Sequence, residues 1–160
     1  MRLPILFSII ILLSACGLHD SNQSLQTRID SLQKKLDNAY KPGLGDFMSD
    51  IQVHHNKLWF AGQAQNWKLA DFEINEIKEA LNGIKQYCTD RPEVKSITMI
   101  DPAIDSISNA IQHKDAQSFK SSYIVLTNTC NNCHHATNHE FNVIKQPDTP
   151  PFSNQSFKAE

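Results

Sequence analysis

Apolar residues recur every three or four positions in four long segments of the chain, and this spacing constrains the fold more than any other feature. In the segment 116–136 the recurring positions are Phe119, Tyr123, Leu126, Cys130 and Cys133. Similar stripes run through 44–61, 67–87 and 102–113. Such spacing places side chains on one face of an α-helix, and short connections favour antiparallel neighbours. The sequence therefore predicts an all-α protein built as an antiparallel four-helix bundle.

The connections between these segments carry recognisable boundary signals. Asn66 is the expected N-cap of the helix over 67–87, and Asp101, which a proline follows, is the expected N-cap of the helix over 102–113. Residues 88–100 contain a proline and are expected to be irregular. Cys88 is expected in an exposed turn there, either as an incidental thiol or as half of an intermolecular disulfide.

The N-terminus has the features of an export signal. Arg2 precedes an apolar run over 5–13 that is too short to span a bilayer, and small residues follow it. The letters LSAC at 13–16 resemble the lipobox of bacterial lipoproteins. The resemblance implies that residues 1–15 are removed and that lipid is attached to Cys16, which anchors the protein stably. No Asp follows this cysteine, which favours the outer membrane, so we expect a lipid-anchored envelope protein that faces the periplasm.

The expected domain order follows from composition. A lipidated tether over 16–24 leads to an amphipathic stalk helix over 25–41. Its apolar positions have coiled-coil spacing, so residues 25–40 can pair weakly with a second copy; they are Leu25, Ile29, Leu32 and Leu36. The helical domain is expected over 44–144, and a Pro-rich tail over 145–160. Lys and Arg number 15 against 17 Asp and Glu, and no basic cluster is present, which argues against nucleic acid as a partner.

The letters CNNCH at 130–134 carry the chemistry. One interpretation is a zinc site, with Cys130, Cys133, His134 or His135, and His139 as ligands. A second is a thiol redox pair, which would need a βαβ context that the sequence does not indicate. The third is the c-type haem attachment signature. On a helix the three motif residues share one face, so both thiols can reach the haem vinyl groups while His134 faces the iron.

Four amphipathic helices with this motif near the end of the last one resemble the cytochrome c prime superfamily of four-helix haem proteins. The resemblance covers about 44–140. The segments KLWFAGQAQNW and PPFSNQ also resemble an uncharacterised family of small bacterial haem-c lipoproteins. What these resemblances imply is one covalent haem c between the first and last helices of the bundle, with His134 as the proximal iron ligand.

The sixth iron position decides the function, and it is left open between Met48 and His55, which share a face of the first bundle helix. His54 is expected to face solvent or to hydrogen-bond the haem edge. His135 is expected to contact solvent or a propionate, and His139 to fold over the haem or bind nothing. A filled sixth position favours electron transfer with redox partner proteins, without enzymatic activity. An open position favours binding of nitric oxide or carbon monoxide.

Two further functions remain as alternatives. Peroxide reduction would use His55 as the acid–base group, but no arginine stands near it in the sequence. A zinc-stabilised lipoprotein would instead use its stalk and tail as contact surfaces.

Overall fold

The computed structural model describes residues 22–37 and 39–159, and the chain divides into two compact units, Met1–Lys41 and Pro42–Glu160. The expected signal peptide over 1–15 and the expected lipidation site, Cys16, lie outside the described residues. No helix in the described ranges is long and apolar enough to cross a membrane.

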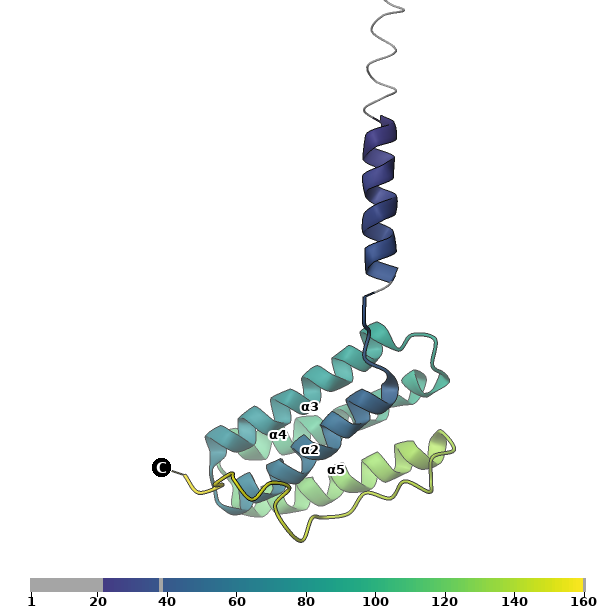
Figure 1. Ribbon diagram of the computed structural model, residues 1–160. Helices are drawn as coiled ribbons and strands as arrows, with labels where there is room; N and C mark the ends of the chain where they lie inside the picture. Colours follow the sequence, from purple (N-terminus) through teal and green to yellow (C-terminus); the bar gives the residue numbers. More distant parts are fainter. Residues whose placement is uncertain (1–21, 38, 160) are drawn as a thin grey trace, which may run out of the picture. The chain divides into compact units, whose positions relative to one another are not determined.

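In the first unit, residues 22–37 form an α-helix, drawn in purple to blue in Figure 1. Residues 22–24 had been expected in the tether, so the helix begins earlier than predicted, and residues 39–41 lie outside it. Hydrogen bonds from Gln26 to Asp30 (2.8 Å) and from Gln33 to Asp37 (2.9 Å) support its surface. Each apolar side chain of its stripe is more than half exposed. Pairing with a second copy stays a prediction.

The second unit holds four α-helices and one 3-10 helix, and the described residues contain no strand. The elements are α2 (Leu44–Gln63), α3 (Trp67–Tyr87), η1 (Pro92–Ile100), α4 (Asp101–Gln112) and α5 (Ala116–Ala136). The predicted all-α class is confirmed, and every expected helix boundary in this unit lies within two residues of the observed one.

The 3-10 helix η1 corrects the expectation that 88–100 is irregular. It spans nine residues, longer than the three or four that such helices usually reach. A 3-10 helix has three residues per turn, so Val94, Ile97 and Ile100 lie on one face; Ile97 and Ile100 are buried and Val94 packs against the core. The step of three residues was the signal in the sequence that an analysis of α-helical spacing misses.

Three helices of the second unit end in the same kind of turn. Gln65, Lys114 and Asn138 each adopt a left-handed conformation, with φ between 54° and 59°, at the ends of α2, α4 and α5. The backbone bonds around them follow the Schellman pattern, which satisfies the last carbonyl groups of a helix. The Asn66 side chain then caps α3 by accepting from Leu69 N–H at 3.2 Å, as predicted, and Asp115 caps α5 in the same way.

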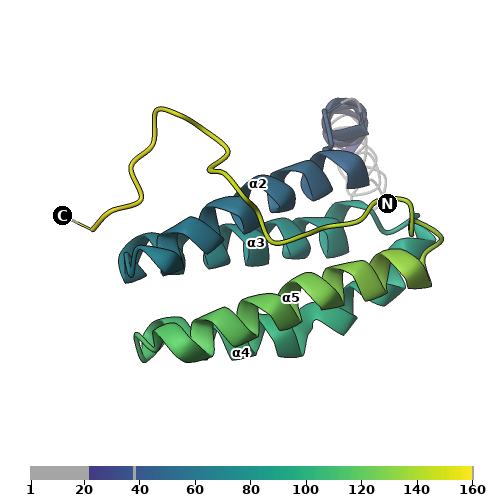
Figure 2. The same cartoon turned by 90° about the horizontal axis from the view of Figure 1, so that it is seen from below.

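The four α-helices pack around one core in two layers, α2 with α3 and α4 with α5 (Figure 2). The helices α2 and α5 run antiparallel. Trp59 in the second half of α2 stacks near Phe119 at the start of α5, whereas His55 bonds to Thr127 further along. Short turns join the two helices of each layer, so their faces meet along most of their length.

The residues after α5 lie against the bundle (Figure 1). Asn131 on α5 bonds to Ile144, and Phe157 is buried with its ring 5.6 Å from the ring of Phe60 on α2. Asn66 also donates to the carbonyl of Lys158 at 3.4 Å. The expected Pro-rich tail is therefore docked at its far end by an aromatic contact.

Candidate functional site

A cavity of about 300 Å³ lies at the end of the second unit where α5 ends. Its walls come from α2, α3, η1, α5 and the segment after α5, and their surface is mostly apolar. The volume is at the lower end of the range of about 300–1,000 Å³ for ligand pockets. The residues of the lining that can bond to a ligand through sulfur or imidazole are Met48, His55, Cys130, Cys133 and His134.

The two cysteines of the motif lie on the same wall because they are three residues apart on α5, nearly one helical turn. Both thiols are free, and the Sγ atom of Cys133 lies 3.7 Å from the carbonyl oxygen of Ser96 in η1. Burial raises the pKa of Cys130 to about 12 and raises the pKa of Cys133 as well. Both are therefore protonated at neutral pH, the less reactive form in thiol–disulfide exchange.

His134 completes the motif one turn beyond Cys130. Its Nδ1 atom lies 2.6 Å from the backbone carbonyl oxygen of Asn142. A carbonyl oxygen only accepts, so Nδ1 carries a proton in this contact, and the tautomer with that single proton keeps a lone pair on Nε2. Histidines that bind metals commonly hold their second nitrogen in this way, because the hydrogen bond fixes the tautomer and the ring orientation.

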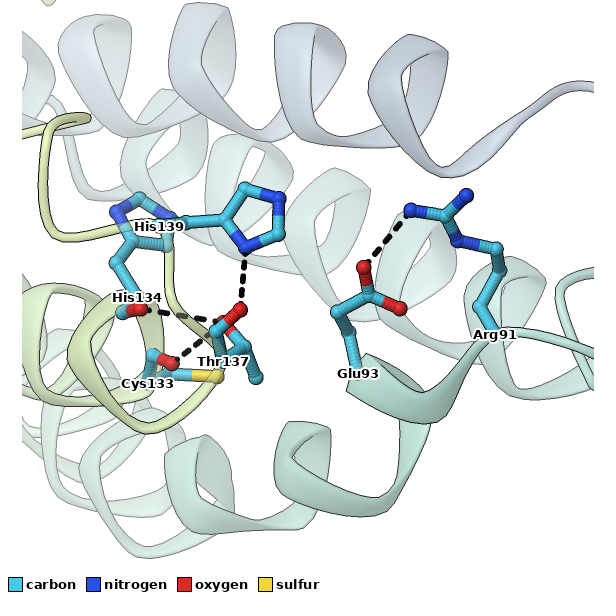
Figure 3. Close-up of polar contacts among 6 residues, drawn as sticks. All are labelled: Arg91, Glu93, Cys133, His134, Thr137 and His139. Atoms are coloured by element: carbon cyan, nitrogen blue, oxygen red, sulfur yellow. Dashed lines mark hydrogen bonds and ion pairs between the residues drawn. The ribbon is translucent and has the colours of Figure 1, made fainter.

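The end of α5, shown in Figure 3 without Asn142, explains why Asn142 meets His134. The Thr137 hydroxyl donates to the carbonyl oxygens of Cys133 (2.9 Å) and His134 (3.2 Å), which closes the last turn. Asn138 then reverses the chain in a left-handed conformation, and the N–H of His139 bonds to the His134 carbonyl at 2.8 Å. The following residues run back past the helix end, which brings Asn142 to the ring of His134.

The other two histidines near the motif point elsewhere. The Nδ1 atom of His139 donates to the carbonyl of Thr137 at 2.7 Å (Figure 3), and His135 is exposed. Within residues 22–37 and 39–159, no group of three or more Cys, His, Asp or Glu side chains is placed to hold a metal ion. The structure therefore does not bring together the ligands that the zinc interpretation requires.

An ion pair lies across from His139 in Figure 3. Arg91 donates to Glu93 at 2.8 Å, and a hydrogen bond from the backbone N–H of Glu93, together with the one from Arg91, lowers the pKa of this carboxyl group. Its second oxygen, Oε2, is buried and has no hydrogen-bond partner in the described part of the chain. The sequence analysis did not single out this pair.

Met48 and His55 both line the wall that α2 contributes, as their seven-residue separation predicts. The two side chains differ in what else they contact. Met48 packs against the apolar core, whereas His55 belongs to a hydrogen-bond network within the bundle.

Both ring nitrogens of His55 are engaged. Nε2 lies 2.9 Å from the hydroxyl of Thr127, and Nδ1 lies 3.0 Å from the hydroxyl of Tyr123. Burial lowers the pKa of His55 from 6.5 to about 4, so the ring is neutral at physiological pH. Each ring nitrogen therefore faces a hydroxyl oxygen, and the lone pair of the neutral ring points at that hydroxyl and not into the cavity.

His54 differs from the expectation. The prediction of a solvent-facing or haem-edge side chain was wrong, because His54 is buried between α2 and α3 with Nδ1 2.6 Å from the carboxylate of Glu73. Glu73 is fully buried, and its other oxygen has no partner in the described residues. Burial of a carboxylate is tolerable only with such a partner, but the sequence places the two residues 19 positions apart and gives no sign of the pairing.

Cys88 also differs from the expectation. It was expected in an exposed turn, but only 3% of its surface is exposed, and its Sγ atom lies 3.9 Å from the carbonyl oxygen of Pro42. The residue continues the buried face of α3 past the end of the helix. A buried thiol is not available for an intermolecular disulfide.

No family model, curated protein or solved structure matches this chain.

Proposed function

We propose that the protein is a monohaem c-type cytochrome, anchored to a membrane by lipid at Cys16, that transfers electrons on the periplasmic side of a bacterial cell envelope, with the outer membrane favoured. In this proposal α2–α5 form an antiparallel four-helix bundle with haem c attached near the end of α5. One observation carries it: Cys130, Cys133 and His134 line a single apolar cavity, and the hydrogen bond to Asn142 leaves Nε2 of His134 free.

The residues of the cavity fit this group. The two thiols would hold haem c through thioether bonds, and Nε2 of His134 would bind the iron. The apolar side chains of Leu81, Ile97 and Ile100 would exclude water from the ring. The bound haem would supply a one-electron redox centre, while the chain sets its orientation and surroundings.

Of the two candidates on α2, Met48 would bind the iron at a smaller cost than His55. His55 would have to give up a hydrogen bond to Thr127 or Tyr123 before it could bind a metal, and a broken bond of a buried polar group costs about 1–3 kcal/mol. The flexible thioether of Met48 has no such cost. A thioether opposite an imidazole is also a ligand pair of electron-transfer cytochromes.

The test of haem attachment is expression in a periplasm that contains the c-type haem maturation machinery. We expect a Soret band, a pyridine haemochrome spectrum of one haem per chain, and haem that stays on the chain after denaturation. Cys130→Ala with Cys133→Ala should abolish covalent attachment. Cys88→Ala is the matched control, because Cys88 is buried outside the cavity, and it should keep the haem. A chain without a Soret band but with one equivalent of zinc would overturn the proposal.

The spin state of the reduced protein tests electron transfer against gas binding. With Met48 bound we expect a six-coordinate low-spin spectrum, which Met48→Ala converts to five-coordinate high-spin. His55→Ala should leave the spectrum low-spin. If the wild-type protein is already high-spin and binds nitric oxide or carbon monoxide, the role is gas binding instead. Peroxide turnover that His55→Ala abolishes would support the enzymatic alternative.

The lipid anchor is tested by fractionation. We expect the wild-type protein in the membrane fraction and a Cys16→Ser variant to remain unprocessed or to leave the outer membrane. An equal distribution of both would remove the anchor from the proposal while leaving haem attachment unaffected.

A further inference from the structure

Asn131, the first of the two residues between the cysteines, bonds to the segment that follows α5. Its Nδ2 atom donates to the carbonyl oxygen of Ile144, and its Oδ1 atom accepts from the N–H of Ile144, both at 2.8 Å. The side-chain amide thus meets both backbone groups of one residue. Two such bonds fix the distance and also the rotation of the segment relative to the helix.

Ile144 lies two residues beyond Asn142, the residue whose carbonyl oxygen accepts from Nδ1 of His134 at 2.6 Å. The other end of the segment is held by the turn at Asn138, and a bond from the Asn142 N–H to the His139 carbonyl (2.9 Å) closes a second turn. The position of the Asn142 carbonyl therefore depends on a helix end on one side and on Asn131 on the other.

We propose that Asn131 is a positioning residue for His134, because by clamping Ile144 it holds the Asn142 carbonyl against Nδ1 and so fixes the tautomer and the donor strength of the ring. The part of this inference that concerns haem rests on the proposed function. Asn131 is not part of the cavity lining, so it acts through the segment that it positions.

The effect on a bound iron has a defined sign. A hydrogen bond from Nδ1 to a carbonyl makes the imidazole more basic. A more basic ligand stabilises the more highly charged ferric state, which lowers the midpoint potential. Loss of the clamp therefore raises the potential.

The test compares Asn131→Ala with Asn132→Ala. Both residues lie between the cysteines on α5, but Asn132 is exposed, so it controls for any general effect of an alanine there. Alanine is the strongest helix former, so neither substitution should unfold α5. Asn131→Asp adds a third variant that keeps an acceptor for the Ile144 N–H but repels the Ile144 carbonyl.

Two measurements are made on each variant. The first is the solvent exchange rate of the His134 Nδ1 proton by ¹H–¹⁵N NMR, in the haem-free chain and in the reduced haem-bound chain. The second is the midpoint potential. We expect Asn131→Ala and Asn131→Asp to raise the exchange rate at least tenfold. The potential should rise by about 59 mV, a tenfold change in the ratio of reduced to oxidised protein for one electron. Asn132→Ala should change neither.

The two proposals fail in different ways. A chain that attaches no haem ends the cytochrome proposal, whereas proton exchange in the haem-free chain still decides whether Asn131 holds the carbonyl. The clamp is overturned if Asn131→Ala leaves the exchange rate at the wild-type value, or if Asn132→Ala changes it equally. A faster exchange with an unchanged potential would overturn the claim that the clamp tunes the iron.

Discussion

The two ends of the second unit are built from the same stripe of α5 but differ in how they are filled. At the start of α5, Phe119 and Tyr123 are fully buried, and Phe119 lies among the aromatic rings of Trp59 and Trp67. At its end the stripe continues with the two cysteines, which border a cavity of about 300 Å³. Protein interiors pack with few voids larger than a water molecule, so the hollow end departs from the rule that the filled end follows.

The filled end is packed to the limit that its backbone permits. A Cβ atom added to Gly62 on α2 would lie 2.1 Å from the ring of Phe119 on α5, so only glycine allows the two helices to approach there. At the hollow end Gly45 is exposed, and an added Cβ there would meet no atom within 4 Å. A second close approach lies nearby, because a Cβ added to Gly83 on α3 would lie 2.5 Å from the ring of Phe47 on α2. The two ends therefore differ in the cavity that borders the cysteines and not in the presence of tight helix contacts.

The largest expected effect is that of Phe119→Ala on the filled end. Loss of a fully buried ring destabilises a core by about 3–5 kcal/mol. The same type of truncation at the hollow end, Cys130→Ala, should cost about 1 kcal/mol, because it removes one sulfur next to existing empty space. Urea unfolding of the haem-free variants measures both values. Equal losses at the two ends would contradict the comparison.

The pH dependence of the free energy of unfolding tests the hydrogen-bond network of His55, at the boundary between the two ends. Burial holds the pKa of His55 at about 4, below the value of 6.5 that it has when unfolded. The unfolded chain therefore takes up a proton first as the pH falls. The stabilisation is present above pH 6.5 and is lost progressively towards pH 4, by about 3 kcal/mol in total.

The comparison variant is His55→Gln, which removes this titration while other ionisable groups stay. The difference in unfolding free energy between the two proteins, measured by urea titration at several pH values, isolates the histidine. We expect this difference to shrink as the pH falls from 6.5. A difference that stays constant would mean that His55 is not held neutral by burial.

A smaller effect is expected from Gly62→Ala. The methyl group would clash with the Phe119 ring, and overpacking of this kind costs about 1–3 kcal/mol. The better helix propensity of alanine returns at most about 1 kcal/mol, so the net change is destabilising. In a Phe119→Ala background the clash partner is absent, and the same substitution should become stabilising. This reversal identifies the ring as the cause.

The sequence predicted the helices well because their signals are local. Apolar residues that alternate at four and three positions show which face of each helix is buried, and caps such as Asn66 mark where helices begin. The same locality placed the motif residues and Met48 on facing walls. The contacts that complete the site are not local. Asn131 and Ile144 are 13 residues apart, and His55 and Thr127 are 72 apart, so no periodicity encodes them.

The errors have related physical reasons. Cys88 follows a helix end, and a proline lies four residues later, so the sequence indicates a surface turn. In the structure η1 folds against the core, and the Cys88 thiol is buried with it. His54 and His55 are adjacent on a helix, so their side chains face different neighbours. The partner that allows His54 to be buried, the carboxylate of Glu73, is supplied only by the tertiary structure. Both were errors about which neighbours a side chain meets, and at Cys88 the unpredicted 3-10 helix contributed to the error.

The smallest expected effect, that of Gly45→Ala, tests whether a ligand at the hollow end reaches the exposed start of α2. Gly45 is in the first turn of α2 and at the cavity wall, and open space surrounds the position of its missing Cβ atom. Alanine should therefore stabilise the haem-free chain by about 0.5–1 kcal/mol through its helix propensity. A haem that fills the cavity near α2 would meet the added methyl group and reduce this gain. Thermal unfolding of both forms, with and without haem, gives the difference. A gain that is equal in the two forms would mean that the ligand does not reach this wall, whereas a loss in the haem-free form would mean that the space at Gly45 is not open.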